Sequence, residues 1–338
     1  MRQAVMTSPG VIEFRNAPVP KPGADEVLIR VKTIGICGSD VHVRHGRHPF
    51  TSYPVVQGHE FSGVVESVGR RVKIITPGMT VTATPQIVCG RCAPCRRGDY
   101  HICDVLKVQG FQAPGCAQEF FVTEAAKIVP LPASFTFEQG ALVEPAAVGV
   151  HAVSRAGRVT GRNVAVLGAG PIGNLVGQVA AAMGAKVLIT DVSGFRLDVA
   201  AKCGLRAASN PAAEDLGAAA ARVFGRKGFH VAFECAGAEP AVNAAIGAIQ
   251  KGGTIVAVGV YGDRPKVNMG LIQDRELTLT GTLMYQYQDF VKAVRLIKGG
   301  RIATQPLETR HFPFAEYKSA YDFIDAEGER SMKVFIDL

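Results

Sequence analysis

Two different patterns of hydrophobic and polar positions divide the chain near residue 148. The first part is dense in glycine and proline and contains short runs of β-branched and aromatic residues, which favour strands. These runs cover residues 27–35, 61–69, 79–87 and 117–123. Short strands at this spacing predict an irregular β domain over residues 1–147.

The second pattern alternates short apolar runs with segments of helical periodicity. We expect strands at residues 162–167, 186–191, 229–234, 253–259 and 276–281, and helices at residues 171–184, 241–249 and 290–298. Strands that alternate with helices build parallel sheets from βαβ units, which predicts an α/β domain over residues 148–285. The chain ends in a further strand at 333–337, and we expect residues 286–338 to return to the first domain.

Composition adds bounds to this picture of a 338-residue, two-domain chain. The sequence contains no run of eighteen apolar residues, so we expect no membrane span. The first residues lack a secretory signal, so we expect a cytoplasmic protein with reduced thiols. The formal net charge is +8, but lysine and arginine are scattered and no basic helix or RNA motif is present. We therefore expect no nucleic-acid partner, while a basic cleft for anionic substrates stays open.

Four cysteines have the spacing C-x2-C-x2-C-x7-C, at Cys89, Cys92, Cys95 and Cys103. Four thiolates at short spacing are the ligands of a structural zinc ion. The alternatives are two disulfides or unrelated thiols, and a reducing compartment disfavours the disulfides. A closed four-ligand site has no position for a substrate, so we expect a structural metal site here rather than a catalytic centre.

A second set of zinc ligands is expected nearer the N-terminus. Cys37 follows a predicted strand in Gly-Ile-Cys-Gly-Ser-Asp, and His59 and Glu60 follow Gly58. Glu144 is a carboxylate in an apolar stretch, where an unpartnered charge is rare. Taken singly, these are ordinary core or capping residues, but as a set they predict a zinc site with room for water or substrate.

A dinucleotide-binding turn is predicted where the strand at 162–167 runs into Gly168-Ala169-Gly170-Pro171-Ile172-Gly173 and a helix. The glycines allow a tight turn, close approach of a pyrophosphate, and close packing of helix and strand. Asp191 ends the next strand, where a carboxylate binds a ribose hydroxyl and repels a 2′-phosphate, which favours NAD over NADP. Arg196 could pack on the adenine or soften this preference.

Cys37-Gly-Ser39, Gly58-His59-Glu60, the four-cysteine lobe and the glycine turn, in this order, resemble the zinc-containing medium-chain alcohol dehydrogenases over essentially the whole chain. Glu144-Pro145, leading into Val148-Gly-Val-His-Ala152, resembles the sorbitol (L-iditol) and related polyol dehydrogenases. The resemblance implies a GroES-like catalytic domain (1–147, completed by 286–338), a doubly wound Rossmann domain (148–285), and a homodimer or homotetramer.

The same resemblance implies roles for the residues of the second zinc set. Cys37 and His59 bind a catalytic zinc, and either Glu60 or Glu144 ligates it while the other holds its water. Ser39 and His42 match the family's proton relay, although His42 could also be a surface histidine. Zinc then polarises the alcohol oxygen, and hydride passes to NAD.

The sequence departs from the polyol branch at two substrate positions. Met284 takes the place of an arginine that contacts the polyol, and Val43 that of a common tyrosine, whereas residues 46–54 resemble bacterial sugar-acid dehydrogenases. We predict NAD-dependent oxidation of a secondary hydroxyl of a small polyol or sugar-derived alcohol. Alternatives are a sugar-acid (aldonate) 5-dehydrogenase, an L-threonine dehydrogenase-like enzyme, or a non-catalytic NAD-binding redox sensor with a structural zinc.

Overall fold

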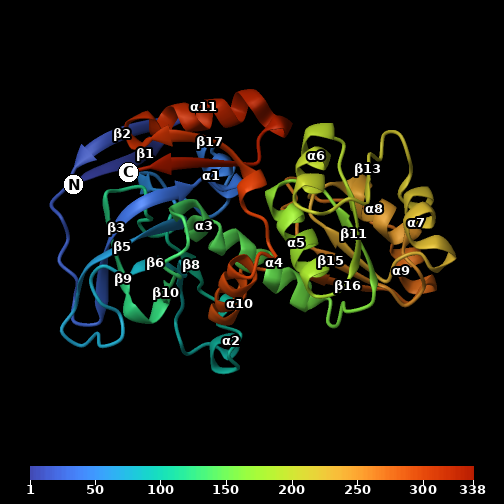
Figure 1. Ribbon diagram of the computed structural model, residues 1–338, viewed down its shortest axis with the longest axis horizontal. Helices are drawn as coiled ribbons and strands as arrows, with labels where there is room; N and C mark the ends of the chain where they lie inside the picture. The colour runs from blue at the N-terminus through green and yellow to red at the C-terminus, as the bar shows by residue number, and fades with distance from the viewer. The chain divides into compact units, whose positions relative to one another are not determined.

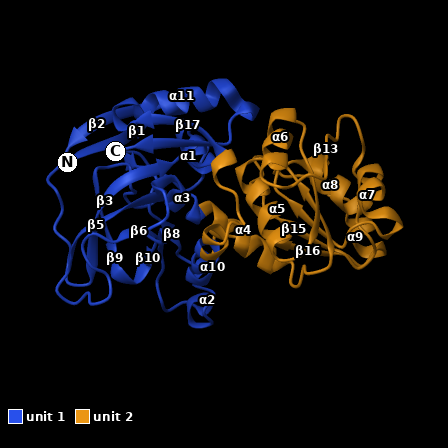
Figure 2. Cartoon of the chain, viewed as in Figure 1, with its two compact units in different colours: residues 1–144, 286–294, 308–338 blue, residues 145–285, 295–307 orange.

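The computed structural model describes all residues 1–338, which divide into two compact units (Figures 1 and 2). Unit 1 contains residues 1–144, 286–294 and 308–338, and unit 2 contains residues 145–285 and 295–307. Both ends of the chain therefore belong to unit 1 (Figure 2). None of the helices combines the length and the apolar character needed to span a bilayer.

Unit 1 is built mainly from strands, and the main sheet gathers segments from both ends of the chain. Its strands are β3 (Glu26–Gly35), β5 (Glu60–Val68), β6 (Thr80–Ala83), β9 (Phe120–Glu124), β10 (Ile128–Pro130), β17 (Glu308–Pro313) and β18 (Lys333–Asp337). They follow the order β10-β6-β5-β3-β18-β17, and β9 also pairs with β3. The last strand, β18, therefore lies antiparallel to β3 and completes the sheet that carries the N-terminal metal-ligand candidates.

Smaller elements surround this sheet. Two further small sheets join β1 (Arg2–Ser8), β2 (Val11–Asn16) and β4 (Val55–Val56), and β7 (Gln86–Ile87) with β8 (Lys107–Val108). The helices are α1 (Gly38–Arg44), α2 (Ala93–Arg96), α3 (Phe137–Ala141) and α11 (Tyr317–Glu327). Helix α11 packs on β17 and β18, as Figure 1 shows, and buries Tyr317 and Tyr321.

Unit 2 is a parallel sheet covered by helices. The strands are β11 (Asn163–Leu167), β12 (Lys186–Thr190), β13 (Ala208–Ser209), β14 (Val231–Glu234), β15 (Thr254–Ala257) and β16 (Thr278–Gly281). Their order is β13-β12-β11-β14-β15-β16. From β11 the chain adds strands first on one side and then, from β14, on the other, and doubly wound sheets bind dinucleotides at this switch point. Helices α5 (Pro171–Ala182) and α6 (Gly194–Lys202) lie on one side, and α7 (Leu216–Phe224), α8 (Glu239–Ala248) and α9 (Met269–Asp274) on the other (Figure 1).

Two helices contain the points where the chain passes between the units. Helix α4 (Val143–Arg155) begins beside the last residue of the first segment of unit 1, and α10 (Tyr287–Lys298) follows the main segment of unit 2. The central strands β11, β12, β14 and β15 are mainly apolar and buried, as strands with helices on both faces are, and their positions were predicted closely. The two-residue edge strand β13 was not predicted, and the other edge strand, β16, is mostly exposed.

The single strand expected at 79–87 is wrong. Residues Thr84 and Pro85 separate β6 from β7, which belong to different sheets. Proline has no N–H to donate to a ladder, so the apolar run cannot continue as one strand. The β-rich pattern of the first part also gave no sign of α1, α2 or α3, which are only four to seven residues long.

The core of unit 1 predicts a clear difference between two isoleucines. Ile29 on β3 is fully buried, whereas the side chain of Ile74 is 85% exposed. We expect Ile29→Ala to lower the unfolding free energy by about 2–5 kcal/mol, because it removes buried methyl groups and leaves a cavity. The control Ile74→Ala should change it by no more than about 0.5 kcal/mol. Thermal unfolding of the zinc-loaded protein measures both, and similar shifts for the two variants would contradict this core assignment.

Candidate functional site

The four cysteines of the lobe meet in unit 1, around the short helix α2. Their sulfur atoms all lie within 4.8 Å of one another, and all eight cysteines of the chain are free thiols. Cys92 caps the N-terminus of α2, its N–H lies 3.3 Å from Cys89 Sγ, and the N–H of Cys89 lies 3.4 Å from Cys103 Sγ. The backbone therefore directs N–H groups at the sulfur atoms, as expected for thiolates that share a cation.

The electrostatics of this lobe fit a bound metal ion. The backbone N–H groups of Arg91 and Cys92 lower the pKa of Cys89 to about 6, whereas burial and the Cys92 thiol raise the pKa of Cys95 to about 12. Four sulfur atoms this close cannot all ionise unless a cation neutralises them. Zinc is the ion that takes four thiolates in a tetrahedron, so the residues present fit it.

The register of two neighbouring strands brings together the second set of ligands. Cys37 follows the end of β3 and caps α1, while His59 and Glu60 stand at the start of β5. Gly35 on β3 pairs with Glu60 on β5, so the end of one strand meets the start of the other. The ligand atoms of Cys37, His59 and Glu60 lie within 4.8 Å of one another.

His59 is buried beside Asp40. Its Nδ1 lies 3.7 Å from Asp40 Oδ1, which is too far for a hydrogen bond, and this nitrogen has no hydrogen-bond partner in the chain. Asp40 Oδ2 accepts a hydrogen bond of 3.0 Å from the N–H of Cys37, and the Gln57 amide donates to the Asp40 carbonyl at 3.2 Å. Burial opposes the charge on His59, but Asp40 and Cys37 outweigh it and hold the pKa of His59 well above its ordinary value. Carboxylate and thiol groups thus surround His59, as the ligands of a cation do.

Glu60 is held by a lysine from the other end of the chain. Its Oε2 accepts a short charge-assisted hydrogen bond from Lys333 Nζ, which also donates to the Ile36 carbonyl at 3.2 Å. Glu60 and Lys333 are buried, with side chains 1% and 3% exposed. A Cβ added at Gly35 would lie 2.5 Å from Glu60 Oε2, so a larger residue there would displace the carboxylate.

These atoms fit a zinc ion with an open coordination position. Glu60 Oε1 is buried without a hydrogen-bond partner, while Oε2 is engaged by Lys333. A thiolate, an imidazole and a carboxylate are three donors that zinc accepts in catalytic sites, where the fourth position is left to water or substrate. An orphaned buried carboxylate oxygen is costly unless a cation contacts it.

The other predicted residues lie at different distances from this set. Glu144, the second residue of α4, is buried and interacts electrostatically with His59 and Lys333, but it is outside the three-ligand group. Ser39 and His42 stand three positions apart on α1 and therefore share a face of that helix. Ser39 is half-buried and His42 is exposed.

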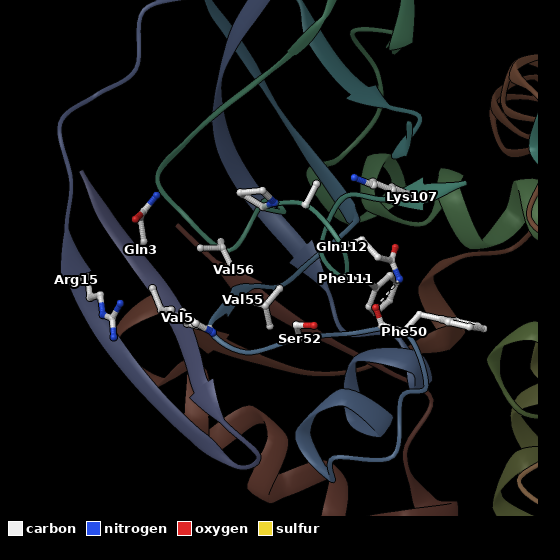
Figure 3. Close-up of a pocket in the computed structure, with 13 residues that line it drawn as sticks. Gln3, Val5, Arg15, Phe50, Ser52, Val55, Val56, Lys107, Phe111 and Gln112 are labelled. Carbon is white, nitrogen blue, oxygen red and sulfur yellow. Dashed lines mark hydrogen bonds between the residues drawn. The ribbon is translucent and has the colours of Figure 1, made fainter. Parts of the chain in front are cut away.

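Phe111 contacts one of the metal-ligand candidates and also lines a cavity. Its ring centroid lies 4.9 Å from that of His59 and 4.6 Å from that of His48. Phe111 also lines a cavity of about 530 Å³ in unit 1, and in Figure 3 it lies with Phe50 and Gln112 at one end, away from Arg15. None of the zinc-ligand candidates lines this cavity, so it is not itself the metal centre.

The glycine turn of unit 2 has the geometry that a dinucleotide requires. Gly168 has φ +100°, and a Cβ there would lie 2.9 Å from Ala236 N. Gly170 caps α5, Pro171 and Ile172 begin it, and a Cβ on Gly173 would lie 1.8 Å from Gly168 O. The turn follows β11 at the sheet's switch point, and the free N–H groups of the helix start form an anion site.

Asp191 and Arg196 are neighbours beside this turn. Asp191 is buried, and its carboxylate accepts hydrogen bonds from Ala169 N at 2.6 Å and Ser193 N at 2.8 Å. Arg196 Nη1 lies 4.0 Å from Asp191 Oδ2 and faces Gly170, while Arg196 Nε is buried without a partner. The structure therefore brings a carboxylate and a guanidinium to the same place, where a ribose with or without a 2′-phosphate would bind.

Three residues of the metal site were missed by sequence reasoning. Asp40 had a usable signal, because an acidic residue three positions after Cys37 completes a capping box. Lys333 was visible only as an isolated lysine beginning an apolar strand, which indicates a buried partner without naming it. Phe111 carries no motif and reaches His59 only through the fold.

Comparison with known proteins agrees with this description. The family model of the alcohol dehydrogenase GroES-like domain matches residues 23–133, and that of the zinc-binding dehydrogenases matches residues 171–299. A 2-dehydro-3-deoxy-L-galactonate 5-dehydrogenase of Pseudoalteromonas atlantica is 36% identical over 94% of this chain and 92% of its own length. Human sorbitol dehydrogenase is also 36% identical, over 94% of this chain and 91% of its own length.

A solved structure extends the agreement to the whole chain. The zinc-binding dehydrogenase of Sinorhizobium meliloti bound to NADP is 32% identical and has a TM-score of 0.93, covering 100% of this chain and 99% of the other. The predicted GroES-like and Rossmann architecture is confirmed. The chain belongs to the zinc-containing medium-chain alcohol dehydrogenases, in the branch that resembles sorbitol dehydrogenase.

Proposed function

We propose that this dehydrogenase oxidises a secondary hydroxyl of a small polyol or sugar-derived alcohol and passes the hydride to NAD. The observation that carries the proposal is the group formed by Cys37, His59 and Glu60, three zinc-type donors with room for one more ligand. A chain that also has a dinucleotide turn then has both halves of a hydride-transfer reaction. A redox sensor would need the turn but not the three-donor site.

We propose that Cys37, His59 and Glu60 hold the catalytic zinc, and that Glu144 lies outside the ligand shell. When bound, zinc polarises the alcohol oxygen and lowers the pKa of its hydroxyl group. Asp40 places a carboxylate 3.7 Å from His59 Nδ1, and Lys333 holds Glu60 so that one carboxylate oxygen is left for the metal. Glu144 adds negative charge near Lys333 and His59, which suits a residue that orients a water or substrate hydroxyl.

We propose Ser39 and His42 as the route by which the alcohol proton leaves. Ser39 is half-buried and follows Cys37 by two residues, whereas His42 on the same face of α1 is exposed. A hydroxyl can accept and donate a proton in one step, and an exposed imidazole can pass a proton to water. The pair therefore connects a half-buried position with solvent.

For the cofactor, Gly168, Gly170, Pro171, Ile172 and Gly173 would hold the pyrophosphate, and Asp191 would accept a hydrogen bond from a ribose hydroxyl. The NADP bound to the Sinorhizobium relative raises the alternative that Arg196 binds a 2′-phosphate here. We favour NAD, because Asp191 is buried and its charge would repel a phosphate group placed against it.

A sugar acid is the second candidate substrate. The relative from Pseudoalteromonas is named a 5-dehydrogenase of a sugar acid. Arg47 is exposed and has no carboxylate partner in the chain, so it could pair with a substrate carboxylate. From the family resemblance we also propose a cytoplasmic homodimer or homotetramer, with residues 1–147 and 286–338 as the catalytic domain and 148–285 as the cofactor domain.

A substrate panel tests the proposed function directly. NADH formation should be measured at 340 nm with sorbitol, xylitol, myo-inositol, L-galactonate, L-threonine and ethanol. We expect the highest kcat/KM with a polyhydroxy compound, because a substrate that leaves buried polar groups of the site unpaired binds less tightly. A higher kcat/KM for ethanol than for every polyhydroxy compound would refute the assignment. An absence of NADH formation with every alcohol would favour the redox sensor.

The two metal sites should differ in lability. The closed four-thiolate site has no exchangeable position, whereas the three-donor site does, so a mild chelator should abolish activity while the fold remains. Cys37→Ser should bind one zinc ion fewer and lose turnover, while the melting temperature of the lobe stays the same. Cys95→Ser should destabilise the lobe. Cys203→Ser, in unit 2, is the control. Zinc analysis that finds one ion or fewer per chain in fresh protein would contradict the two-site proposal.

Asp191 should decide the choice between NAD and NADP. Two like charges about 4 Å apart repel by about 1 kcal/mol in water and about 4 kcal/mol near a protein surface. Asp191→Ala should therefore lower the ratio of kcat/KM for NAD over NADP by about tenfold or more. The exposed Asp198 on α6 supplies the control Asp198→Ala, which should leave the ratio unchanged. A wild-type preference for NADP would overturn this reading and point to Arg196.

A further inference from the structure

His48 is a histidine held firmly beside the metal site without a role assigned to it so far. Its ring stacks on Phe111, with the centroids 4.6 Å apart and the planes at 6°. Thr51 Oγ1 lies 2.7 Å from His48 Nδ1. The ring is therefore fixed by a flat aromatic contact on one face and by a hydrogen bond at one nitrogen. Nε2 has no hydrogen-bond partner within the chain.

The position of His48 relates it to the proposed reaction centre. Phe111, on which it stacks, also contacts the ring of His59 at a centroid distance of 4.9 Å. His48 interacts electrostatically with His42 and His59, and burial together with these two neighbours lowers its pKa. His48 thus packs on the same ring that a zinc-ligand candidate contacts, within electrostatic range of that histidine and of a relay candidate.

Its neighbours in the sequence are occupied elsewhere. Arg44 forms ion pairs with Asp322 and Asp325 of α11, and His45 Nε2 lies 3.0 Å from Asp325 Oδ1. Within the basic segment 44–48, these two side chains are neutralised by α11. The exposed Arg47 and the half-buried His48 form no ion pair with α11.

We propose that His48 Nε2 binds a hydroxyl group of the substrate other than the one that is oxidised, and so determines specificity for polyhydroxy compounds. This inference rests on the proposed function and specifies its substrate class. A hydroxyl group fits either tautomer of His48, because it both donates and accepts, and Thr51 can do the same at Nδ1. A carboxylate would satisfy only the tautomer with a proton on Nε2.

The decisive comparison is between a flat ring without nitrogens and a side chain that keeps the hydrogen bond. His48→Phe preserves the stacking on Phe111 but removes Nε2, and His48→Gln keeps a polar group. Thr51→Val leaves the imidazole but releases Nδ1. His45→Gln, three residues away and bonded to α11, is the control.

Kinetics should be measured with sorbitol, xylitol, myo-inositol and L-galactonate, and with 2-propanol, a secondary alcohol with no second hydroxyl. For the best polyhydroxy substrate we expect His48→Phe to raise KM about threefold to tenfold with kcat nearly unchanged, since one hydrogen bond is lost. Activity on 2-propanol should not change. His48→Gln should restore part of the KM, and Thr51→Val should show a smaller rise than His48→Phe.

Equal losses on 2-propanol and on the polyhydroxy substrate, or no change in KM, would overturn the inference. Calorimetric titration of the same compounds into the zinc-loaded wild type and His48→Phe separates it from the proposed function. Binding that weakens in His48→Phe, without turnover in the wild type, would support the His48 site and refute only the reaction. If the wild type binds and oxidises none of the polyhydroxy compounds, both proposals are wrong.

Discussion

The buried ion pair between Glu60 and Lys333 is the interaction on which the proposed catalytic site depends. An isolated charge buried in a protein costs several kcal/mol, and each of these two side chains balances part of the charge of the other. Glu60 begins β5 and Lys333 begins β18, and both strands pair with β3. The last strand must therefore dock before the carboxylate is balanced, and Gly35 must lack a side chain for the two charges to meet. The placement of one carboxylate beside a thiol and an imidazole thus depends on the strand order, on a glycine in β3 and on a lysine near the C-terminus.

The two metal-ligand groups are assembled in different ways. The four cysteines lie within fifteen residues of one another, and local turns with N–H groups aimed at sulfur hold them. The Cys37 group depends on the register between β3 and β5, on Asp40 behind His59, and on β18. A local cage suits a structural ion, since it needs little from the rest of the fold. A site built from several strands exposes an open position and can be tuned by residues outside the ligand shell.

What could be predicted from the sequence follows the same distinction. The central strands of the parallel sheet were predictable because they are largely buried and read as continuous apolar runs, whereas the two-residue edge strand β13 was not predicted. The cysteine lobe and the glycine turn were predictable because their residues lie close together in the sequence, so that their spacing alone brings them together in the structure. Lys333, Gly35 and Phe111 were not, because each acts on a residue far away in the sequence. The break at Pro85 was missed for the opposite reason, since a strong β pattern concealed a single residue that cannot extend a ladder.

The basic segment after α1 shows why charge counted along a sequence is a poor guide to the substrate. Arg44 and His45 suggest an anion site in the sequence, yet in the structure both side chains pair with carboxylates of α11, from Asp322 and Asp325. The half-buried His48 forms none of these pairs and stacks on Phe111. In the role proposed for it, an imidazole that can donate or accept discriminates by hydroxyl pattern rather than by charge. The fold thus leaves fewer unpaired charges in this segment than the sequence indicates, and Arg47 is the exposed cation at its edge.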